Sequence, residues 1–280
     1  MLILFSVLVL VVIAAISAAV LYAASQKFKV FEDSRINNVE MLLPGVNCGG
    51  CGFSGCKIFA EKTVQTENLN ELYCTAGGQK TMSAVAEILQ KEVVEIIPDI
   101  AVVRCNGTPQ NRPRTNIFDG GKSCAVATLT YGGETACTYG CLGYGDCVPV
   151  CKFDAISMNN ETNLPEIDRE KCTACGVCVK TCPKKIIEIR KTCAEHTSTS
   201  LSNHSRSKKE NAVFVCCVNE DKGAVAAKAC KMACIGCEKC KKVCEFDAIS
   251  IHHFLAYIDD KKCTNCGKCV KICPTKSIVY

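Results

Sequence analysis

Cysteine dominates the chemistry available to this sequence, with 26 among its 280 residues. Two runs share the spacing C-x2-C-x2-C-x3-C with a proline directly after the last cysteine: Cys172, Cys175, Cys178 and Cys182, and Cys263, Cys266, Cys269 and Cys273. At this spacing three thiolates on one tight loop bind a 4Fe–4S cluster, and the fourth binds a neighbouring cluster. A tetrahedral zinc site needs only two cysteine pairs and gives no reason for a third cysteine at the same interval. The spacing therefore favours iron–sulfur chemistry over zinc.

An earlier cysteine set precedes each run and supplies a partner cluster. One earlier set repeats the same spacing with Glu245 in place of the proline, and the other has the looser spacing C-x3-C-x5-C-x3-C. The last cysteine of each set is expected to complete the cluster of its partner set. The expected ligand sets are Cys137, Cys141 and Cys147 with Cys182; Cys172, Cys175 and Cys178 with Cys151; Cys234, Cys237 and Cys240 with Cys273; and Cys263, Cys266 and Cys269 with Cys244.

A separate set near the amino terminus has the spacing C-x2-C-x4-C-x17-C and consists of Cys48, Cys51, Cys56 and Cys74. Glycines between its first three cysteines let the backbone fold closely around a cluster. The same glycines match a G-x-G-x-x-G pattern, but no apolar strand leads into them, so we discount a nucleotide site. This set brings the expected total to five 4Fe–4S clusters on twenty cysteines.

Six cysteines remain outside these sets: Cys105, Cys124, Cys193, Cys216, Cys217 and Cys230. We favour ordinary buried or incidental thiols, the usual state of an unpaired cytosolic cysteine. The alternative is that Cys105, Cys124, Cys217 or Cys230 takes a cluster corner, because these residues lie near the start of an internal repeat.

The internal repeat covers the carboxyl two-thirds of the chain. CVPVCKFDAIS from Cys147 matches CKKVCEFDAIS from Cys240, and AVVRC ending at Cys105 resembles VFVCC ending at Cys217. A repeat of this kind indicates two copies of one structural unit. The apolar run from Asp99 to Arg104 predicts a short strand before the first unit, and Ala84, Ile88, Leu89 and Val93 recur at helical spacing.

An uncharged segment from Leu2 to Ala24 would span roughly 34 Å as a helix, enough to cross a bilayer. It lacks the basic start of a cleaved signal peptide and is longer than the apolar part of one, so we predict a membrane anchor. Lys27 and Lys29 follow it, and the positive-inside rule then places the soluble part in the cytoplasm. That reducing compartment disfavours a disulfide framework.

The formal net charge of +5 does not indicate nucleic-acid binding. Each four-thiolate cluster carries about −2 when oxidised, so a chain loaded with five clusters would sit at roughly −5. No catalytic triad or carboxylate pair stands out, and we expect no catalytic residue and no flavin or NAD site on this chain. The predicted chemistry is electron transfer alone.

These observations predict an α+β protein with one transmembrane helix, a small helical 4Fe–4S domain and two tandem ferredoxin-like modules that each hold two clusters. The expected divisions are the anchor at 1–25, the 4Fe–4S domain at 26–98, a connecting segment with a short strand at 99–136, the first module at 137–193, a polar linker at 194–212 and the second module at 213–280.

In its order of motifs the chain resembles the B subunits of Rnf complexes, the membrane-bound, ion-translocating ferredoxin:NAD oxidoreductases. The resemblance rests on the apolar helix, then CGGCGFSGC with Cys74, then GCLGYGDCVPVC and the two modules. It implies an iron–sulfur subunit of an oxidoreductase complex that takes electrons from soluble ferredoxin and passes them to other Rnf subunits. It also implies a single-pass protein of a bacterial or archaeal cytoplasmic membrane.

Two other functions are compatible with cysteine-rich modules of this kind. One is an iron–sulfur subunit of a different membrane-associated dehydrogenase or hydrogenase, and the other is a zinc-binding scaffold without redox activity. The order of motifs and the amino-terminal helix count against the first, and the cysteine spacing counts against the second.

Overall fold

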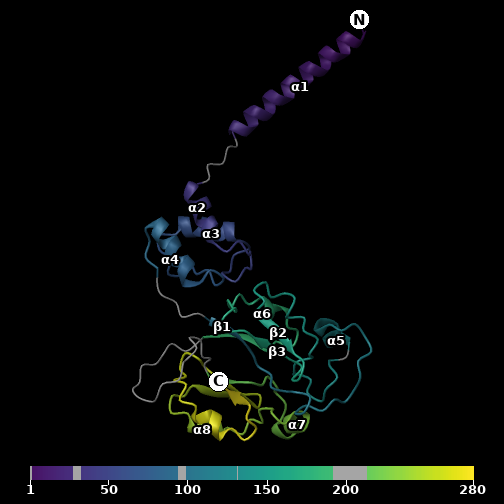
Figure 1. Ribbon diagram of the computed structural model, residues 1–280, viewed down its shortest axis with the longest axis vertical. Helices are drawn as coiled ribbons and strands as arrows, with labels where there is room; N and C mark the ends of the chain where they lie inside the picture. The colour runs from purple at the N-terminus through teal and green to yellow at the C-terminus, as the bar shows by residue number, and fades with distance from the viewer. Residues whose placement is uncertain (1, 28–32, 94–98, 131, 192–212) are drawn as a thin grey trace.

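The computed structural model describes residues 2–27, 33–93, 99–130, 132–191 and 213–280 (Figure 1). The predicted anchor forms one helix, α1 (Leu2–Lys27), which ends two residues beyond the expected boundary at 25. Its segment Phe5–Lys27 is long and apolar enough to cross a membrane, and none of the hydrophobic window is buried in the protein. Apolar surface of this extent without protein cover is typical of a segment that lies in lipid. This arrangement supports a membrane-associated protein.

A small helical unit follows, built from α2 (Ser34–Leu42), α3 (Cys56–Gln65) and α4 (Gly78–Leu89). The side chain of Asp33 accepts a hydrogen bond from the backbone N–H of Arg35 and caps α2, which satisfies one of the unpaired amides at the helix start. The three helices enclose a core that includes Val39, Phe59 and Met82.

The buried face of α4 differs from the one that its sequence suggests. Its buried side chains are Met82, Val85, Ala86 and Leu89, whereas Ile88 is 42% exposed. The helix ends at Leu89 because Gln90 adopts a left-handed conformation, a common way to stop a helix. Val93 therefore lies beyond the helix, although it still packs against the same core.

The remaining chain forms two similar units, each with two antiparallel strand pairs and short helices. The first unit contains β1 (Asp99–Val103), α5 (Cys124–Thr130), β2 (Ile156–Asn159), β3 (Leu164–Ile167), α6 (Val177–Thr181) and β4 (Ile187–Lys191). The second contains β5 (Phe214–Val215), α7 (Gly223–Ala229), α8 (Lys239–Val243), β6 (Ile249–His252), β7 (Leu255–Ile258), α9 (Lys268–Ile272) and β8 (Ile278–Val279). The mixed helix and strand content confirms the predicted α+β class.

Strand pairing shows that the two units are equivalent. β1 pairs with β4, and β5 pairs with β8, so the opening and closing strands of each unit lie together. Directly after each opening strand, the amide of Arg104 donates to Ile186 O at 2.6 Å and the amide of Cys216 donates to Ser277 O at 2.7 Å. The predicted strand at Asp99 is confirmed, and the segment 99–136 contributes a strand to the first unit. The predicted linker at 194–212 lies outside the described residues.

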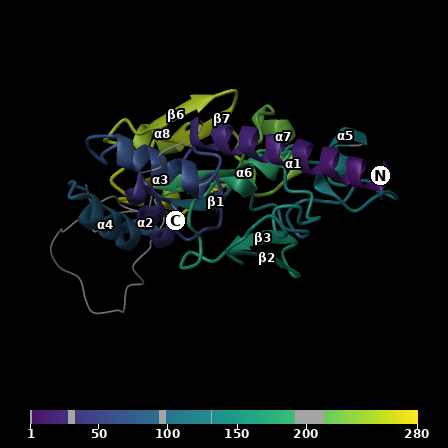
Figure 2. The same cartoon turned by 90° about the horizontal axis from the view of Figure 1, so that it is seen from above.

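Two arginines and one glutamate join the two units. Glu188 on β4 forms ion pairs with Arg104 at 3.0 Å and with Arg190 at 3.2 Å. Arg104 also donates to Val215 O and Cys217 O of the second unit, and Arg190 donates to Ile258 O at 2.6 Å. These bonds place the β6–β7 hairpin on the opposite side of β1 from β2 and β3 (Figure 2).

Tyr257 completes this contact between the units. Its hydroxyl donates to Glu188 at 2.9 Å, and its ring lies 5.3 Å from the guanidinium of Arg104 and 5.4 Å from that of Arg190. Cation–π contacts of this kind add to the ion pairs. Burial and the bond to Glu188 both raise the pKa of Tyr257, so its hydroxyl stays a donor at neutral pH.

We expect Glu188→Gln to lower the free energy of unfolding by roughly 3 kcal/mol, since removing one partner leaves buried charges unneutralised. Arg190 is only 2% exposed, so water cannot replace the lost carboxylate. Denaturant unfolding of the purified protein measures the change. The matched variant Glu166→Gln, at an exposed glutamate on β3, should change the free energy by less than about 0.5 kcal/mol. Equal effects of the two variants would contradict this role.

Candidate iron–sulfur sites

The amino-terminal cysteine set lines one cavity of about 340 Å³, formed by Cys48, Cys51, Cys56 and Cys74. Asn47 adopts a left-handed conformation with φ of 49°, and its side-chain oxygen accepts from the amide of Cys56 at 2.7 Å. This bond fixes the loop against the start of α3. The sulfur of Cys74 accepts from the amide of Gly77 at 3.3 Å, the kind of bond that stabilises a thiolate.

Both cysteine sets expected in the second unit also surround cavities. The cavities measure about 330 and 340 Å³, and the cysteines around them are Cys234, Cys237, Cys240 and Cys273 in one, and Cys244, Cys263, Cys266 and Cys269 in the other. Cys237 and Cys266 are exposed, so both cavities reach the surface. Burial alone would raise the pKa of Cys273, but hydrogen bonds from Ser277 and Thr275 hold it below the usual value.

In the first unit the structure departs from the expected ligand set. A cavity of about 370 Å³ is lined by Cys141, Cys147 and Cys182 together with Cys124, and Cys137 faces a different cavity. The backbone amides of Tyr144 and Gly145 donate to the sulfur of Cys124.

A signal in the sequence could have indicated this exchange. Cys230, Cys234, Cys240 and Cys244 have the same C-x3-C-x5-C-x3-C spacing as Cys137, Cys141, Cys147 and Cys151. In that register Tyr144 stands where the second unit has Cys237. The first unit thus lacks one loop cysteine, and α5 brings Cys124 to the cavity that Cys141, Cys147 and Cys182 line. Asp146 holds the start of α5 by accepting from Ser123 Oγ at 2.8 Å and from the amide of Ala125 at 3.1 Å.

The remaining expected set lies beside this site. Burial, together with the nearby Cys172 and Cys175, raises the pKa of Cys178 to about 12. Cys151 packs against the hydrophobic cluster that contains Cys178, and its sulfur accepts from the amide of Ala155 at 3.4 Å.

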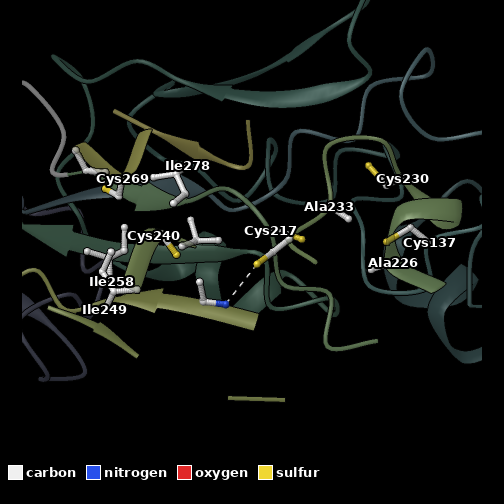
Figure 3. Packing of buried hydrophobic residues seen from close by; sticks show 14 of the residues in the cluster. Cys137, Cys217, Ala226, Cys230, Ala233, Cys240, Ile249, Ile258, Cys269 and Ile278 are labelled. Atoms are coloured by element: carbon white, nitrogen blue, oxygen red, sulfur yellow. Dashed lines mark hydrogen bonds between the residues drawn. The ribbon is translucent and has the colours of Figure 1, made fainter. Parts of the chain in front are cut away.

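Five further cysteines line another cavity of about 320 Å³: Cys105, Cys137, Cys216, Cys217 and Cys230. Only Cys137 among them belongs to an expected ligand set. Figure 3 shows Cys137 and Cys230 at one end of the buried cluster, away from Cys240 and Cys269. The last unassigned cysteine, Cys193, lies outside the described residues.

Burial also makes several expected ligands weak acids. It raises the pKa of Cys141 and Cys240 to about 12, and that of Cys147 and Cys269 to about 11. Such thiols stay protonated at neutral pH unless a cation compensates the thiolate. Iron binding supplies that compensation and releases the protons, so cluster assembly is coupled to the formation of these sites.

The arrangement suits polynuclear clusters better than single ions. Within the described residues, no three His, Cys, Asp or Glu side chains converge on one point as ligands of a single metal ion. A zinc site requires four ligand atoms about 2 Å from the metal. The four cysteines around each of these cavities match the four-thiolate ligand set of a 4Fe–4S cluster instead.

The helical unit touches the first repeat unit at a cysteine loop. A Cβ atom at Gly50 would lie 2.8 Å from Cys175 Cα and 3.0 Å from Cys175 Cβ, so only glycine permits this approach. Lys152 adds a bond from its ammonium to Val46 O at 3.0 Å. The amino-terminal cysteine site therefore lies directly beside the site that contains Cys175.

Comparisons with known proteins agree with this assignment of chemistry. The family described as a 4Fe-4S dicluster domain matches residues 136–186 and 233–277, and a putative Fe-S cluster family matches residues 43–71. The chain is 37% identical over 259 residues to the B subunit of the ion-translocating oxidoreductase complex from Methanosarcina acetivorans, covering 92% of this chain and 90% of that protein. It belongs to this family of B subunits.

Other members of the family carry more specific names. The chain is 40% identical over 240 residues to the B subunit of the Na(+)-translocating ferredoxin:NAD(+) oxidoreductase complex from Acetobacterium woodii, covering 86% of this chain and 66% of that protein. It is 34% identical over 255 residues to the B subunit of the proton-translocating ferredoxin:NAD(+) oxidoreductase complex from Clostridium ljungdahlii, covering 91% of this chain and 84% of that protein. The chain is thus an iron–sulfur electron-transfer subunit of the Rnf type.

We expect Cys124→Ser to remove one cluster, or about four irons and four sulfides, from the anaerobically purified protein. The reason is that Cys124 lines the same cavity as Cys141, Cys147 and Cys182, and the loop has Tyr144 where the second unit has Cys237. Iron and acid-labile sulfide analysis measures the loss. Leu129→Ala is the matched control because Leu129 lies on the same helix, is 88% exposed and does not line the cavity. Full iron content in Cys124→Ser would contradict the assignment.

We expect Gly50→Ala to slow electron exchange between the amino-terminal site and the first unit, since the new methyl group must push the two apart. Rapid-freeze EPR after partial reduction would follow the exchange. Gly121→Ala is the control because a Cβ there meets no atom within 4 Å. Iron content should stay unchanged in both variants, and an unaltered exchange rate in Gly50→Ala would show that the contact is not needed.

Proposed function

We propose that this chain accepts electrons from reduced soluble ferredoxin and relays them through at least five 4Fe–4S clusters to other subunits of an Rnf complex. The observation that carries this proposal is the grouping of cysteines from distant parts of each unit around cavities of similar size. Each bound cluster supplies one-electron chemistry, with a potential set by charge, hydrogen bonds and exposure.

The proposed ligands follow the sequence assignment with one exchange, Cys124 for Cys137. The sets are Cys48, Cys51, Cys56 and Cys74; Cys151, Cys172, Cys175 and Cys178; Cys124, Cys141, Cys147 and Cys182; Cys234, Cys237, Cys240 and Cys273; and Cys244, Cys263, Cys266 and Cys269. Residues around them hold the sulfurs in place and tune them. The amides of Gly77, Ala155 and Ala256 donate to ligand sulfurs at 3.3 to 3.5 Å, which favours the reduced state by spreading negative charge.

Lys184 has a positioning role at the first-unit site. It follows Cys182 and Pro183, and its ammonium donates to Gly132 O at 2.8 Å and Thr138 O at 2.7 Å. These two bonds fasten the chain before Cys141 to the turn that carries Cys182. Burial lowers the pKa of Lys184, and the carbonyl partners offset the loss of water around its charge.

We further propose that α1 anchors the chain in a cytoplasmic membrane with its soluble units on the cytoplasmic side. The lysines that follow the apolar segment support this orientation through the positive-inside rule. Soluble ferredoxin would then meet the exposed units directly. We assign NAD and flavin chemistry to partner subunits, since the sequence motifs of this chain concern only iron–sulfur sites.

The test is reduction of the full-length, anaerobically purified protein by catalytic amounts of a ferredoxin that is itself kept reduced. We expect bleaching of the visible iron–sulfur absorbance, EPR signals of reduced 4Fe–4S clusters, and at least about 20 irons per chain. The control omits ferredoxin but keeps its reducing system. Zinc without sulfide, or clusters that ferredoxin leaves oxidised, would contradict the proposal.

A further inference from the structure

The cavity between the two repeat units carries features that none of the five proposed sites uses. It lies where the opening strands β1 and β5 end, and its volume of about 320 Å³ is close to that of the proposed cluster sites. Its cysteines come from both units: Cys105 and Cys137 from the first, and Cys216, Cys217 and Cys230 from the second.

Four of these cysteines form two equivalent pairs. Cys105 and Cys217 each follow an opening strand by the same hydrogen-bonded step. Cys137 and Cys230 each begin the shared C-x3-C-x5-C-x3-C spacing. Each unit therefore contributes the same two corners to one cavity, as expected for a site on the pseudo-twofold axis of a duplicated protein.

Cys216 also borders the cavity, but the direction of its side chain separates it from these four cysteines. Consecutive residues in extended backbone point to opposite sides, and Cys216 packs in a separate cluster with Ile100, Val102 and Phe214. Its thiol donates to Val103 O at 3.4 Å. Cys217, in contrast, belongs to the same buried cluster as Cys137 and Cys230.

The four sulfurs accept N–H bonds of the kind seen at the proposed ligands. Asn219 is 1% exposed and serves two of them, donating from its backbone to Cys217 at 3.4 Å and from Nδ2 to Cys137 at 3.5 Å. The amide of Cys141 donates to Cys105 at 3.4 Å, and the amide of Met232 donates to Cys230.

A buried positive charge faces the same cavity. Arg112 lines it and is only 5% exposed, yet its Nε and Nη1 have no hydrogen-bond partner within the described part of the chain. An arginine cannot lose its proton in a protein, and an unpaired buried charge is strongly destabilising. An anion bound in this cavity would therefore neutralise Arg112 and stabilise the folded protein.

Two glycines allow Arg112 to occupy this place. A Cβ atom at Gly140 would overlap Nη1 of Arg112, and one at Gly107 would lie 3.3 Å from its Cδ and 3.6 Å from the sulfur of Cys105. The backbone at Gly107 and Gly140 thus closes tightly around the guanidinium, and at Gly107 it also lies beside the Cys105 thiol.

We propose that Cys105, Cys137, Cys217 and Cys230 bind a sixth 4Fe–4S cluster between the two repeat units, with Arg112 as its counter-charge. A four-thiolate cluster carries about −2 and so provides the anion that Arg112 lacks. The proposal rests on the proposed iron–sulfur function, because the same cofactor must be available to all sites.

Its position would join the two units into one series of sites. The amide of Cys141, a proposed ligand of the first unit, donates to the sulfur of Cys105. The amide of Cys234, a proposed ligand of the second unit, donates to the sulfur of Cys217. The interface site is therefore linked by one hydrogen bond to a proposed cluster site in each unit.

The first test is iron and sulfide analysis of full-length Cys217→Ser, Cys230→Ser and the double variant, all purified anaerobically. We expect about 24 irons in the unchanged protein and about 20 in each of the three variants, because both residues serve one cluster. Cys216→Ser is the matched control and should keep about 24 irons. An unchanged protein with about 20 irons and variants without further loss would overturn the sixth site while leaving the proposed function intact.

The second test changes the charge of Arg112 and leaves every cysteine in place, so it does not depend on a variant that has lost a ligand. Arg112→Gln keeps hydrogen-bond donors but removes the charge, so one cluster should become harder to reduce while the iron content stays unchanged. An EPR-monitored redox titration of the full chain, compared with that of the unchanged protein, follows the reduction of the clusters. A single signal shifted to lower potential supports the site, and a titration identical to that of the unchanged protein overturns the role of Arg112.

Discussion

Neutralisation of two buried arginines by Glu188 is the interaction on which the arrangement of the two units depends. Arg104 and Arg190 would each be costly to bury alone, and each also donates to backbone carbonyls of the second unit. The ion network therefore fixes the distance and angle between the units. The relative position of the units brings the ends of β1 and β5 together, and so determines which cysteines meet at the interface.

Cysteine takes over much of the role that large apolar side chains have in other small domains. The chain has no Trp and only 6% aromatic residues, and the hydrophobic clusters of both repeat units include several cysteines. Without iron these sulfurs surround space that no side chain fills, and close packing is lost. The folded state of both units should thus depend on cofactor assembly, as in other small metal-binding domains.

Local spacing predicted the kind of cofactor, because three cysteines separated by two residues each on one tight loop are typical ligands of one 4Fe–4S cluster. The strand at Asp99 and the amino-terminal apolar helix were also predicted from local sequence alone. The place of Cys124 at this cavity was not predictable from local spacing, since Cys124 lies outside the cysteine runs and reaches the cavity only in the folded unit. The positions of Cys105 and Cys217 depend on the pairing of the opening and closing strands of each unit. Which face of α4 is buried depends on the helices that pack against it. In each case contacts between distant segments decided the outcome.

Cys237 and Cys266 lie exposed at the rim of the two cavities in the second unit, whereas their neighbours Cys240 and Cys269 are buried. A surface where a cluster corner is accessible shortens the path for an incoming protein donor, and it also admits small oxidants. Dioxygen should therefore attack this unit first. The working life of the whole chain in air is then set by two residues at its rim, however well the inner sites are shielded.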